Sequence, residues 1–173
     1  MNGLIHIYTG DGKGKTTAAV GLAVRSAGYG KRVLFVQFLK DNQSGEIVPL
    51  KQIGVTVRGL SKPYDFVFRL SASEKEQLAA EQNQLLQQVV EECLAEKWDL
   101  VVLDEIMVAC QLQVADGTLI DFLLQNKPQQ LELVLTGRDA PAQWQARAHY
   151  VTEMVLHKHP YTQGIVAREG IEY

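Results

Sequence analysis

The sequence predicts an α/β fold of three layers, in which a mainly parallel sheet lies between two layers of helices. Three observations predict it: short apolar runs alternate with helical segments, a glycine-rich loop joins the first run to the first helix, and acids directly follow a later run. Consecutive apolar residues are typical of strands that are buried on both faces, as in parallel sheets. A single domain over residues 1–173 is expected, since 46% hydrophobic residues suffice for one core.

The first expected unit is a strand, a loop, a helix and a second strand. Residues 4–8 form a short apolar run before the glycine-rich loop, and an alanine-rich helix then continues through Ala27. Gly28 and Gly30 end this helix, because glycine adopts the backbone conformation of a helix C-terminus without strain. Residues 32–38 form the second strand, which contains four consecutive apolar residues.

The next segment contains a polar loop over residues 40–46, a short helix before Gly54 and a third strand over residues 55–60. The loop follows the carboxyl end of the second strand, which is the end that faces ligands in such sheets. Residues 61–70 combine Pro63 with three aromatic residues. Loops seldom present three aromatic side chains unless these pack against the protein or bind a ligand.

A long helix and three more strands complete the expected sheet. Ser73 and Glu76 have the spacing of a capping box, and the leucines and valines that follow share one face of a helix. Residues 100–103 form a buried strand that ends in two acids. The other expected elements are helices over residues 106–114 and 119–125 and strands over residues 131–135 and 151–156.

The composition argues against several classes of protein. The net charge of -3 provides no general attraction to nucleic acids. No apolar run approaches the roughly 20 residues that cross a bilayer, and the first residues lack the pattern of a secretion signal. We therefore expect a cytoplasmic protein that binds neither nucleic acid nor membrane. Cys93 and Cys110 are far from any paired spacing, so we expect two reduced thiols instead of a disulfide or a zinc site.

The glycine-rich loop matches a Walker A phosphate-binding motif in which Thr9 stands where the first glycine usually does. In such loops the backbone N–H groups and the helix N-terminus bind phosphate oxygens. Lys15 would add a positive charge and Thr16 a hydroxyl ligand for Mg²⁺. The expected ATP-binding residues of the loop are Thr9, Gly10, Asp11, Gly12, Lys13, Gly14, Lys15, Thr16 and Thr17.

The apolar run over residues 101–103 continues into Asp104 and Glu105, which is the pattern of a Walker B motif. A parallel strand would deliver these carboxylates to the sheet edge where the loop lies, close to the magnesium ion. The two motifs together predict a P-loop NTPase (RecA-like) fold that binds ATP or GTP with Mg²⁺ or Mn²⁺. They do not identify the acceptor of the reaction, because unrelated reactions use this fold.

Beyond these motifs, the chain resembles the P-loop ATP:corrinoid adenosyltransferases over almost its whole length. The resemblance lies in TGDGKGKTTAA (residues 9–19), VQF (36–38), VLDE (102–105), TGR (136–138) and the closing GIEY (170–173). The doubled Gly-Lys and the closing tail distinguish this family from other P-loop proteins.

That resemblance implies a homodimeric enzyme in which the Co(I) of a corrinoid attacks the ribose C5′ of ATP and releases triphosphate. It implies ATP held in an orientation reversed from that of P-loop hydrolases, and an electron donor such as a reduced flavoprotein. Lys15, Thr16 and Glu105 would be catalytic, with Thr16 and Glu105 at the metal and Asp104 behind them. The other expected nucleotide contacts are Arg138, for which an exposed turn position is the alternative, and, as a weaker candidate, Arg25.

The resemblance also concerns the aromatic segment, where family members displace the lower ligand of cobalt with two aromatic side chains. Counting from Gly54, Tyr64 and Phe66 occupy these positions, where the family has phenylalanine and tryptophan. We expect them to contact the corrin, with core packing as the alternative for both and for Phe68. For the tail residues His157, His159 and Tyr161, a surface or packing role is favoured over a ligand pocket.

Other classes of function are compatible with the same motifs. A RecA-like ATPase module would hydrolyse ATP to ADP and use the energy for motion or partner binding. A nucleotide-binding regulatory protein would bind ATP or a corrinoid without turnover. A small-molecule kinase is less favoured, since the chain lacks a lid segment rich in arginine.

Overall fold

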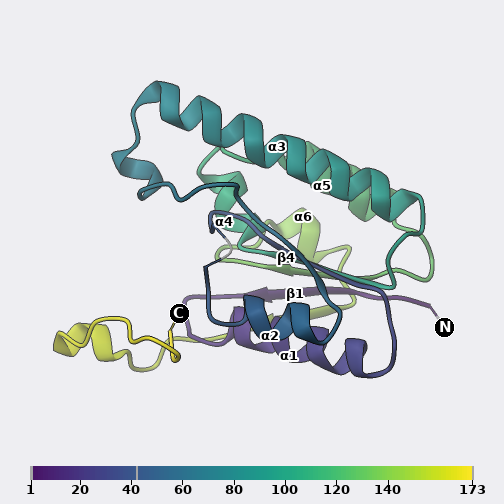
Figure 1. The fold of residues 1–173 in the computed structure, drawn as a ribbon, viewed down its shortest axis with the longest axis horizontal. Helices are drawn as coiled ribbons and strands as arrows, with labels where there is room; N and C mark the ends of the chain where they lie inside the picture. Colours follow the sequence, from purple (N-terminus) through teal and green to yellow (C-terminus); the bar gives the residue numbers. More distant parts are fainter. Residues whose placement is uncertain (1, 42, 173) are drawn as a thin grey trace.

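A computed structural model describes residues 2–41 and 43–172. Within this part of the chain, six strands form one sheet in the order β3-β2-β4-β5-β1-β6, and all paired strands are parallel. The strands are β1 (Ile5–Thr9), β2 (Val33–Gln37), β3 (Thr56–Arg58), β4 (Leu100–Asp104), β5 (Glu132–Thr136) and β6 (Tyr150–Glu153). Helices cover both faces of the sheet (Figure 1), which confirms the predicted three-layer α/β/α fold.

Two layers of helices pack on the sheet. Alternate residues of β2 point to opposite faces of the sheet. Leu34 and Val36 pack with α3 and α5, whereas Val33 and Phe35 pack with α1 and α2. The helices are α1 (Lys15–Gly28), α2 (Ile47–Gln52), α3 (Ala72–Leu94), α4 (Ile106–Gln111), α5 (Gly117–Asn126) and α6 (Ala142–Gln145), with 3₁₀ turns η1 (Val67–Arg69) and η2 (Pro160–Gln163).

Several local features differ from the predictions, including the last strand, which was expected over residues 151–156 and is β6 at Tyr150–Glu153. The capping box of α3 is formed by Ser71 and Glu74 instead of Ser73 and Glu76: the Ser71 hydroxyl accepts from the Glu74 N–H, and the Glu74 carboxylate accepts from the Ser71 N–H. The helix expected over residues 106–114 is shorter, because Gln113 has a left-handed backbone (φ 58°). The short helix α6 was not predicted.

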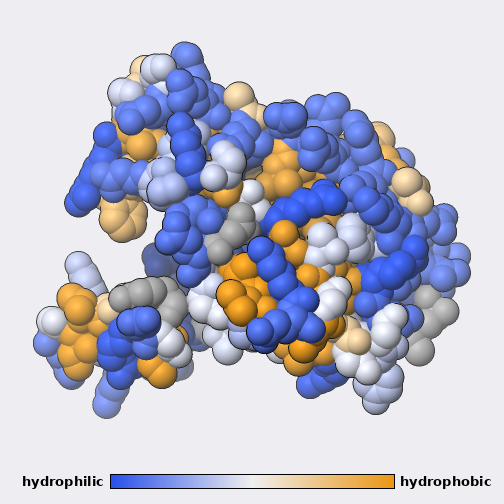
Figure 2. Space-filling model, in the orientation of Figure 1, coloured by the Kyte–Doolittle hydropathy of each residue, from blue (hydrophilic) through white to orange (hydrophobic). Residues whose placement is uncertain are grey.

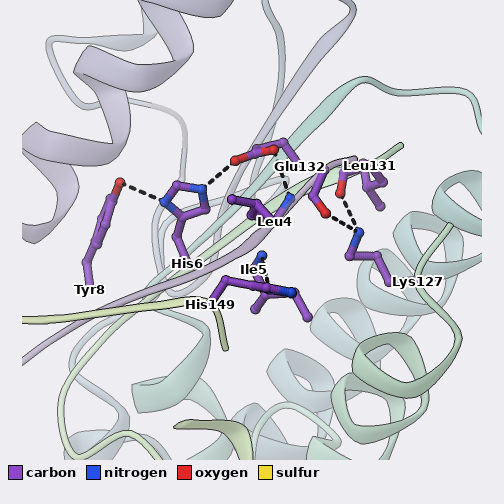
Figure 3. A network of polar contacts seen from close by, with 9 residues as sticks. Leu4, Ile5, His6, Tyr8, Lys127, Leu131, Glu132 and His149 are labelled. Atoms are coloured by element: carbon purple, nitrogen blue, oxygen red, sulfur yellow. Dashed lines mark hydrogen bonds and ion pairs between the residues drawn. The ribbon is translucent and has the colours of Figure 1, made fainter. Parts of the chain in front are cut away.

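A polar network fixes the start of β1, the strand that leads into the glycine-rich loop (Figure 3). The Glu132 carboxylate accepts from the Leu4 N–H at 2.9 Å and contacts the His6 ring. The His149 ring accepts from the Ile5 N–H at 3.0 Å. These contacts attach β1 to β5 and to the segment before β6, so the loop begins from a strand that is held on both sides.

The chain extends from the body of the molecule in two places at the same side (Figure 1): the segment of residues 61–70 and the C-terminal tail after β6. Figure 2 shows the surface hollowed between them. None of the helices of residues 2–41 and 43–172 could cross a membrane. Cys93 is a buried free cysteine, and Cys110 is a half-buried one.

Candidate functional site

The glycine-rich loop runs from the end of β1 to the start of α1 and packs against the end of β6. Gly10 and Gly14 have φ values of 98° and 126°, which favour glycine. A Cβ on Gly12 would lie 2.6 Å from the carbonyl oxygen of Met154, and the Gly12 N–H donates to that same oxygen. The glycines of the motif are therefore required by the shape of the loop and by its contact with Met154.

Lys15 begins α1, and its side chain lies across the loop. Its ammonium donates to the carbonyl oxygens of Gly10 (2.6 Å) and Gly12 (2.9 Å). Burial lowers the pKa of Lys15, and the nearby Glu105 carboxylate opposes this shift. No side chain of the described residues caps the start of α1, so its first N–H groups are available to an anion.

Asp104 connects helix α1, the end of β5 and the loop after β2. It is fully buried at the end of β4, and its Oδ1 accepts hydrogen bonds from the hydroxyls of Thr16 (2.8 Å) and Thr136 (2.7 Å). Its Oδ2 accepts from the ammonium of Lys40 at 3.0 Å. The sequence prediction placed Asp104 behind Glu105, and it did not include Thr136 or Lys40.

Glu105 follows in a left-handed backbone conformation (φ 62°) at the start of α4. Its N–H donates to the Thr136 hydroxyl at 2.9 Å. Burial raises the pKa of the Glu105 carboxyl, and the charge of Asp104 raises it further. The charges of Lys40, Lys15 and Arg138 act in the opposite direction and lower this pKa.

The loop borders a cavity of about 300 Å³. Its walls include Asp11, Gly12, Lys13, Gly14, Lys15, Thr16, Thr17, Glu105 and Arg138. Thr9 and Gly10 line a separate cavity of about 210 Å³, and the Thr9 hydroxyl accepts from the Ala140 N–H. Most of the residues predicted to bind ATP therefore lie together, while Thr9 contacts a neighbouring turn.

A second cavity, of about 680 Å³, lies beside the first and shares Glu105 and Arg138 with it. Tyr64, Phe66 and Phe68 line this second cavity. The rings of Phe66 and Phe68 are stacked with centroids 5.5 Å apart, and the side chains are largely exposed. Neither phenylalanine packs in the core, so the alternative prediction of core packing is wrong for Phe66 and Phe68.

Tyr64 is half-buried, and its ring packs against the edge of the hydrophobic core. Its hydroxyl donates to the Glu81 carboxylate at 3.2 Å. This contact attaches the aromatic segment to helix α3, so Tyr64 has both a packing role and a position in the cavity wall.

The two candidate arginines lie at different distances from the loop. The Arg138 guanidinium lies 3.4 Å from the Asp11 carboxylate, and both side chains are exposed at the mouth of the cavity. Arg25 is exposed on α1, ten residues beyond Lys15, which corresponds to about 15 Å along the helix axis. The structure thus brings Arg138, and not Arg25, to the phosphate loop.

The C-terminal tail returns to the loop, which the sequence alone did not show. The Glu172 carboxylate accepts from Lys13 at 2.8 Å and from Arg168 at 3.0 Å. His159 and Glu172 lie in the wall of the loop cavity. A further cavity of about 530 Å³ between tail and loop is lined by His157, His159 and Tyr161, among others. His157 and Tyr161 are exposed, as the favoured surface role predicts, and they border this cavity as well.

The oxygen atoms at the site fit a magnesium ion. The donors are the Thr16 hydroxyl and the carboxylates of Asp104 and Glu105. Mg²⁺ binds oxygen ligands, and it usually keeps several waters and binds substrate phosphates in place of a full set of protein ligands. In the described part of the chain, no three His, Cys, Asp or Glu side chains could hold a metal ion by themselves.

Comparison with known proteins identifies the relatives of this chain. The family model described as "ATP:corrinoid adenosyltransferase BtuR/CobO/CobP" matches residues 1–173. A corrinoid adenosyltransferase of Sinorhizobium sp is 33% identical over 99% of this chain and 80% of its own. The corrinoid adenosyltransferases of Escherichia coli K12 and Pseudomonas aeruginosa are 30% and 32% identical, over 99% of this chain and 86% and 84% of their own.

Proposed function

This chain belongs to the ATP:corrinoid adenosyltransferase family. From this premise we propose which of its residues act on ATP, on Mg²⁺ and on the corrinoid during the transfer. The enzyme transfers the 5′-deoxyadenosyl group of ATP to the cobalt of a corrinoid. In the proposed reaction the electron pair of Co(I) forms a bond to C5′, the C5′–oxygen bond breaks, and triphosphate leaves with that bond's electrons. Negative charge therefore increases on the phosphate chain as the bond breaks.

The observation that supports this assignment most directly is the pair of adjoining cavities. A triphosphate at the loop cavity would place the nucleoside at the border formed by Glu105 and Arg138, next to the aromatic cavity. This agrees with the reversed nucleotide orientation that the family resemblance implies. A corrin against Tyr64 and Phe66 would then face C5′ from the other side of that border.

The residues of the loop act on the leaving group. Lys15 and the N–H groups at the start of α1 bind and stabilise the triphosphate, and the increase in charge makes these contacts stronger in the transition state. Arg138 contacts the nucleotide from the turn after β5. Thr16 and Glu105 hold Mg²⁺, which supplies further positive charge to the phosphates when bound. No proton is removed from the nucleophile, so the site needs no general base.

The aromatic segment acts on the corrin. Tyr64 and Phe66 exclude the lower axial ligand of cobalt, and a reduced flavoprotein supplies the electrons that give Co(I). The two positions carry side chains different from those of the family pattern, but both line the aromatic cavity.

The protein acts as a homodimer with the whole activity in one domain over residues 1–173. Apolar side chains along the tail are exposed in the single chain, where a second copy would cover them. They include Leu156, Tyr161, Ile165, Val166 and Ile171. Sedimentation at micromolar concentration tests this, and a species with the mass of one 19.3 kDa chain would contradict it.

An anaerobic assay tests the reaction itself. The purified protein is mixed with chemically reduced cob(I)alamin, ATP and Mg²⁺, and the light-sensitive alkylcobalt product and the released phosphates are measured. We expect one triphosphate for each adenosylcobalamin. ADP and phosphate without alkylated cobalt would contradict the assignment and would favour the ATPase module.

A further inference from the structure

Lys40 lies in the wall of the aromatic cavity, at a position that neither motif explains. It follows β2, and its side chain lines the aromatic cavity together with Glu105 and Arg138. It also lines a cavity of about 420 Å³ with Thr16 and Thr17. The ammonium can therefore reach the place where a nucleotide bound at the loop meets the corrin.

The backbone around Lys40 is held in an unusual conformation. Leu39 has a left-handed backbone (φ 63°), which costs a residue other than glycine about 1 kcal/mol. Hydrogen bonds on both sides maintain it: the Leu39 N–H donates to the Gln82 side chain, and the Lys40 carbonyl accepts from the Leu60 N–H at 2.9 Å. Strained conformations that the surrounding structure enforces are concentrated at functional sites.

The partner of Lys40 is Asp104, which also accepts from the hydroxyl of Thr16, a residue of the proposed magnesium site. Its ammonium lies 3.0 Å from Oδ2 of Asp104, which is fully buried, whereas Lys40 is 32% exposed. Burial lowers the pKa of Lys40, but the charge and hydrogen bond of Asp104 raise it more, so the side chain is a cation. A divalent cation at Thr16 would place two positive charges beside Asp104 and would weaken the hold of this carboxylate on Lys40.

We propose that Lys40 is a further catalytic residue, a mobile cation that leaves Asp104 when Mg²⁺ and ATP bind and then contacts the α-phosphate, whose bridging oxygen departs from C5′. The flexible four-carbon stem of lysine permits this exchange. The ammonium remains protonated throughout and donates hydrogen bonds to oxygens of the α-phosphate as the triphosphate departs. This inference rests on the proposed adenosyl transfer and adds a residue to it.

The test compares three variants in the anaerobic assay. Lys40→Gln removes the charge but keeps a donor for Asp104, Lys40→Arg keeps the charge, and Lys51→Gln is the control on an exposed face of α2. Removing one group that stabilises developing charge typically lowers kcat by about 100-fold. We expect that loss for Lys40→Gln with KM for the corrinoid unchanged, a loss of about 10-fold or less for Lys40→Arg, and none for the control.

A binding measurement gives a second readout that does not depend on turnover. In Lys40→Gln the side chain that contacts Asp104 carries no positive charge, so Mg²⁺ should bind more readily near this carboxylate. Mg²⁺ alone should therefore raise the Tm of Lys40→Gln more than it raises the Tm of the wild type. Wild-type kcat in Lys40→Gln, or equal Tm shifts in the two proteins, would overturn the role of Lys40 while leaving adenosyl transfer intact. A wild-type protein that makes no adenosylcobalamin would overturn the proposed function and this inference with it.

Discussion

Lys15 stabilises the conformation of the glycine-rich loop in addition to its expected role in phosphate binding. Its ammonium is satisfied by two uncharged carbonyl oxygens, those of Gly10 and Gly12. Phosphate oxygens are charged acceptors, and hydrogen bonds to them are about twice as strong as those between neutral groups. Binding of a triphosphate would therefore exchange weaker contacts of Lys15 for stronger ones.

We expect Lys15→Met to weaken ATP binding by about 100-fold, because a charged hydrogen bond and its Coulomb attraction are lost, about 3 kcal/mol. Lys31→Met is the matched control, since Lys31 is exposed in the turn before β2. Isothermal calorimetry with ATP and Mg²⁺ measures both. Equal affinities in the two variants would show that the loop does not bind the triphosphate.

Phe66→Leu should lower kcat/KM for the corrinoid by about 5-fold, since loss of a stacked aromatic surface costs about 1 kcal/mol. ATP affinity should stay at the wild-type value, because Phe66 lies in the aromatic cavity and outside the loop cavity. Tyr29→Leu removes another exposed ring, just past the far end of α1, and serves as the control. Steady-state kinetics with varied corrinoid measure the effect. An unchanged kcat/KM would contradict a corrin contact at Phe66.

The elements of the fold bring the site together at one edge of the sheet. The loop follows β1, Asp104 ends β4 and Thr136 ends β5, so three parallel strands deliver these groups from the same direction. Helix α3 sits farther away but supports the aromatic segment through Tyr64. At its other end, α3 is attached to β3 by the bonds between Arg58 and Glu92.

Glu92 should make the stability of the protein depend on pH. Burial by itself raises the pKa of Glu92, but hydrogen bonds from Arg58, Lys97 and Trp98 outweigh this and lower it to about 2. The ionised carboxylate of Glu92 stabilises the fold at pH values above about 4.5, and this contribution is lost as the pH falls toward 2 and the carboxylate is protonated. Because the site is close to solvent, we expect Glu92→Gln to cost about 1 kcal/mol at pH 7.

Urea unfolding at pH 7 and pH 3 checks this expectation. The difference between Glu92→Gln and the wild type should shrink at pH 3, where the stabilising effect of the carboxylate is partly lost. Glu91→Gln, a change at the neighbouring exposed position, should have little effect at either pH. A difference that stays constant with pH would mean that the charge of Glu92 contributes nothing.

The tail should compete with the nucleotide for Lys13. Glu172→Gln removes the carboxylate that accepts from Lys13 and frees this ammonium beside the phosphate loop. We expect ATP to bind a few-fold more tightly at low salt, with a smaller gain at high salt, because the pair is near the surface. Fluorescence titration with a labelled ATP analogue measures it, with Glu169→Gln as the control in the same tail. A weaker affinity would instead assign Glu172 to nucleotide binding.

At the scale of the whole molecule, the two projecting segments border the hollow at the carboxyl edge of the sheet (Figures 1 and 2). The tail contacts the loop through Glu172, and the aromatic segment borders the cavity that reaches Glu105. Ligands of both cavities would therefore contact parts of the chain that are distant in sequence. Binding should stabilise the fold as a whole.

ATP with Mg²⁺ at about 100 times its Kd should add about 2.7 kcal/mol to the free energy of unfolding. For a chain of 173 residues this corresponds to a rise in Tm of about 5 to 10 °C. Differential scanning fluorimetry measures the shift, which chelation of Mg²⁺ should reduce. AMP serves as the control ligand, because it lacks the triphosphate. An equal shift with AMP would contradict recognition through the phosphate chain.

The sequence by itself determined the layers of the fold, most of the strands and the two phosphate-site motifs. These features depend on neighbouring residues: runs of apolar residues, glycines in one loop, and acids at the end of one strand. Helix boundaries were predicted less well: the capping box of α3 was expected at Ser73, whereas the packed backbone forms it at Ser71.

Only the tertiary structure decided how the site residues meet. Asp104 contacts Thr16, Thr136 and Lys40 from positions 88, 32 and 64 residues away. Lys13 meets Glu172 from 159 residues away. The two motifs placed Asp104 near Thr16, but no local pattern encodes the contacts of Lys40, Thr136 and Glu172, because these arise when parallel strands align their carboxyl ends and the tail returns to the loop. Burial of Asp104 then makes its partners specific, since a buried carboxylate must be matched by donors and by a cation.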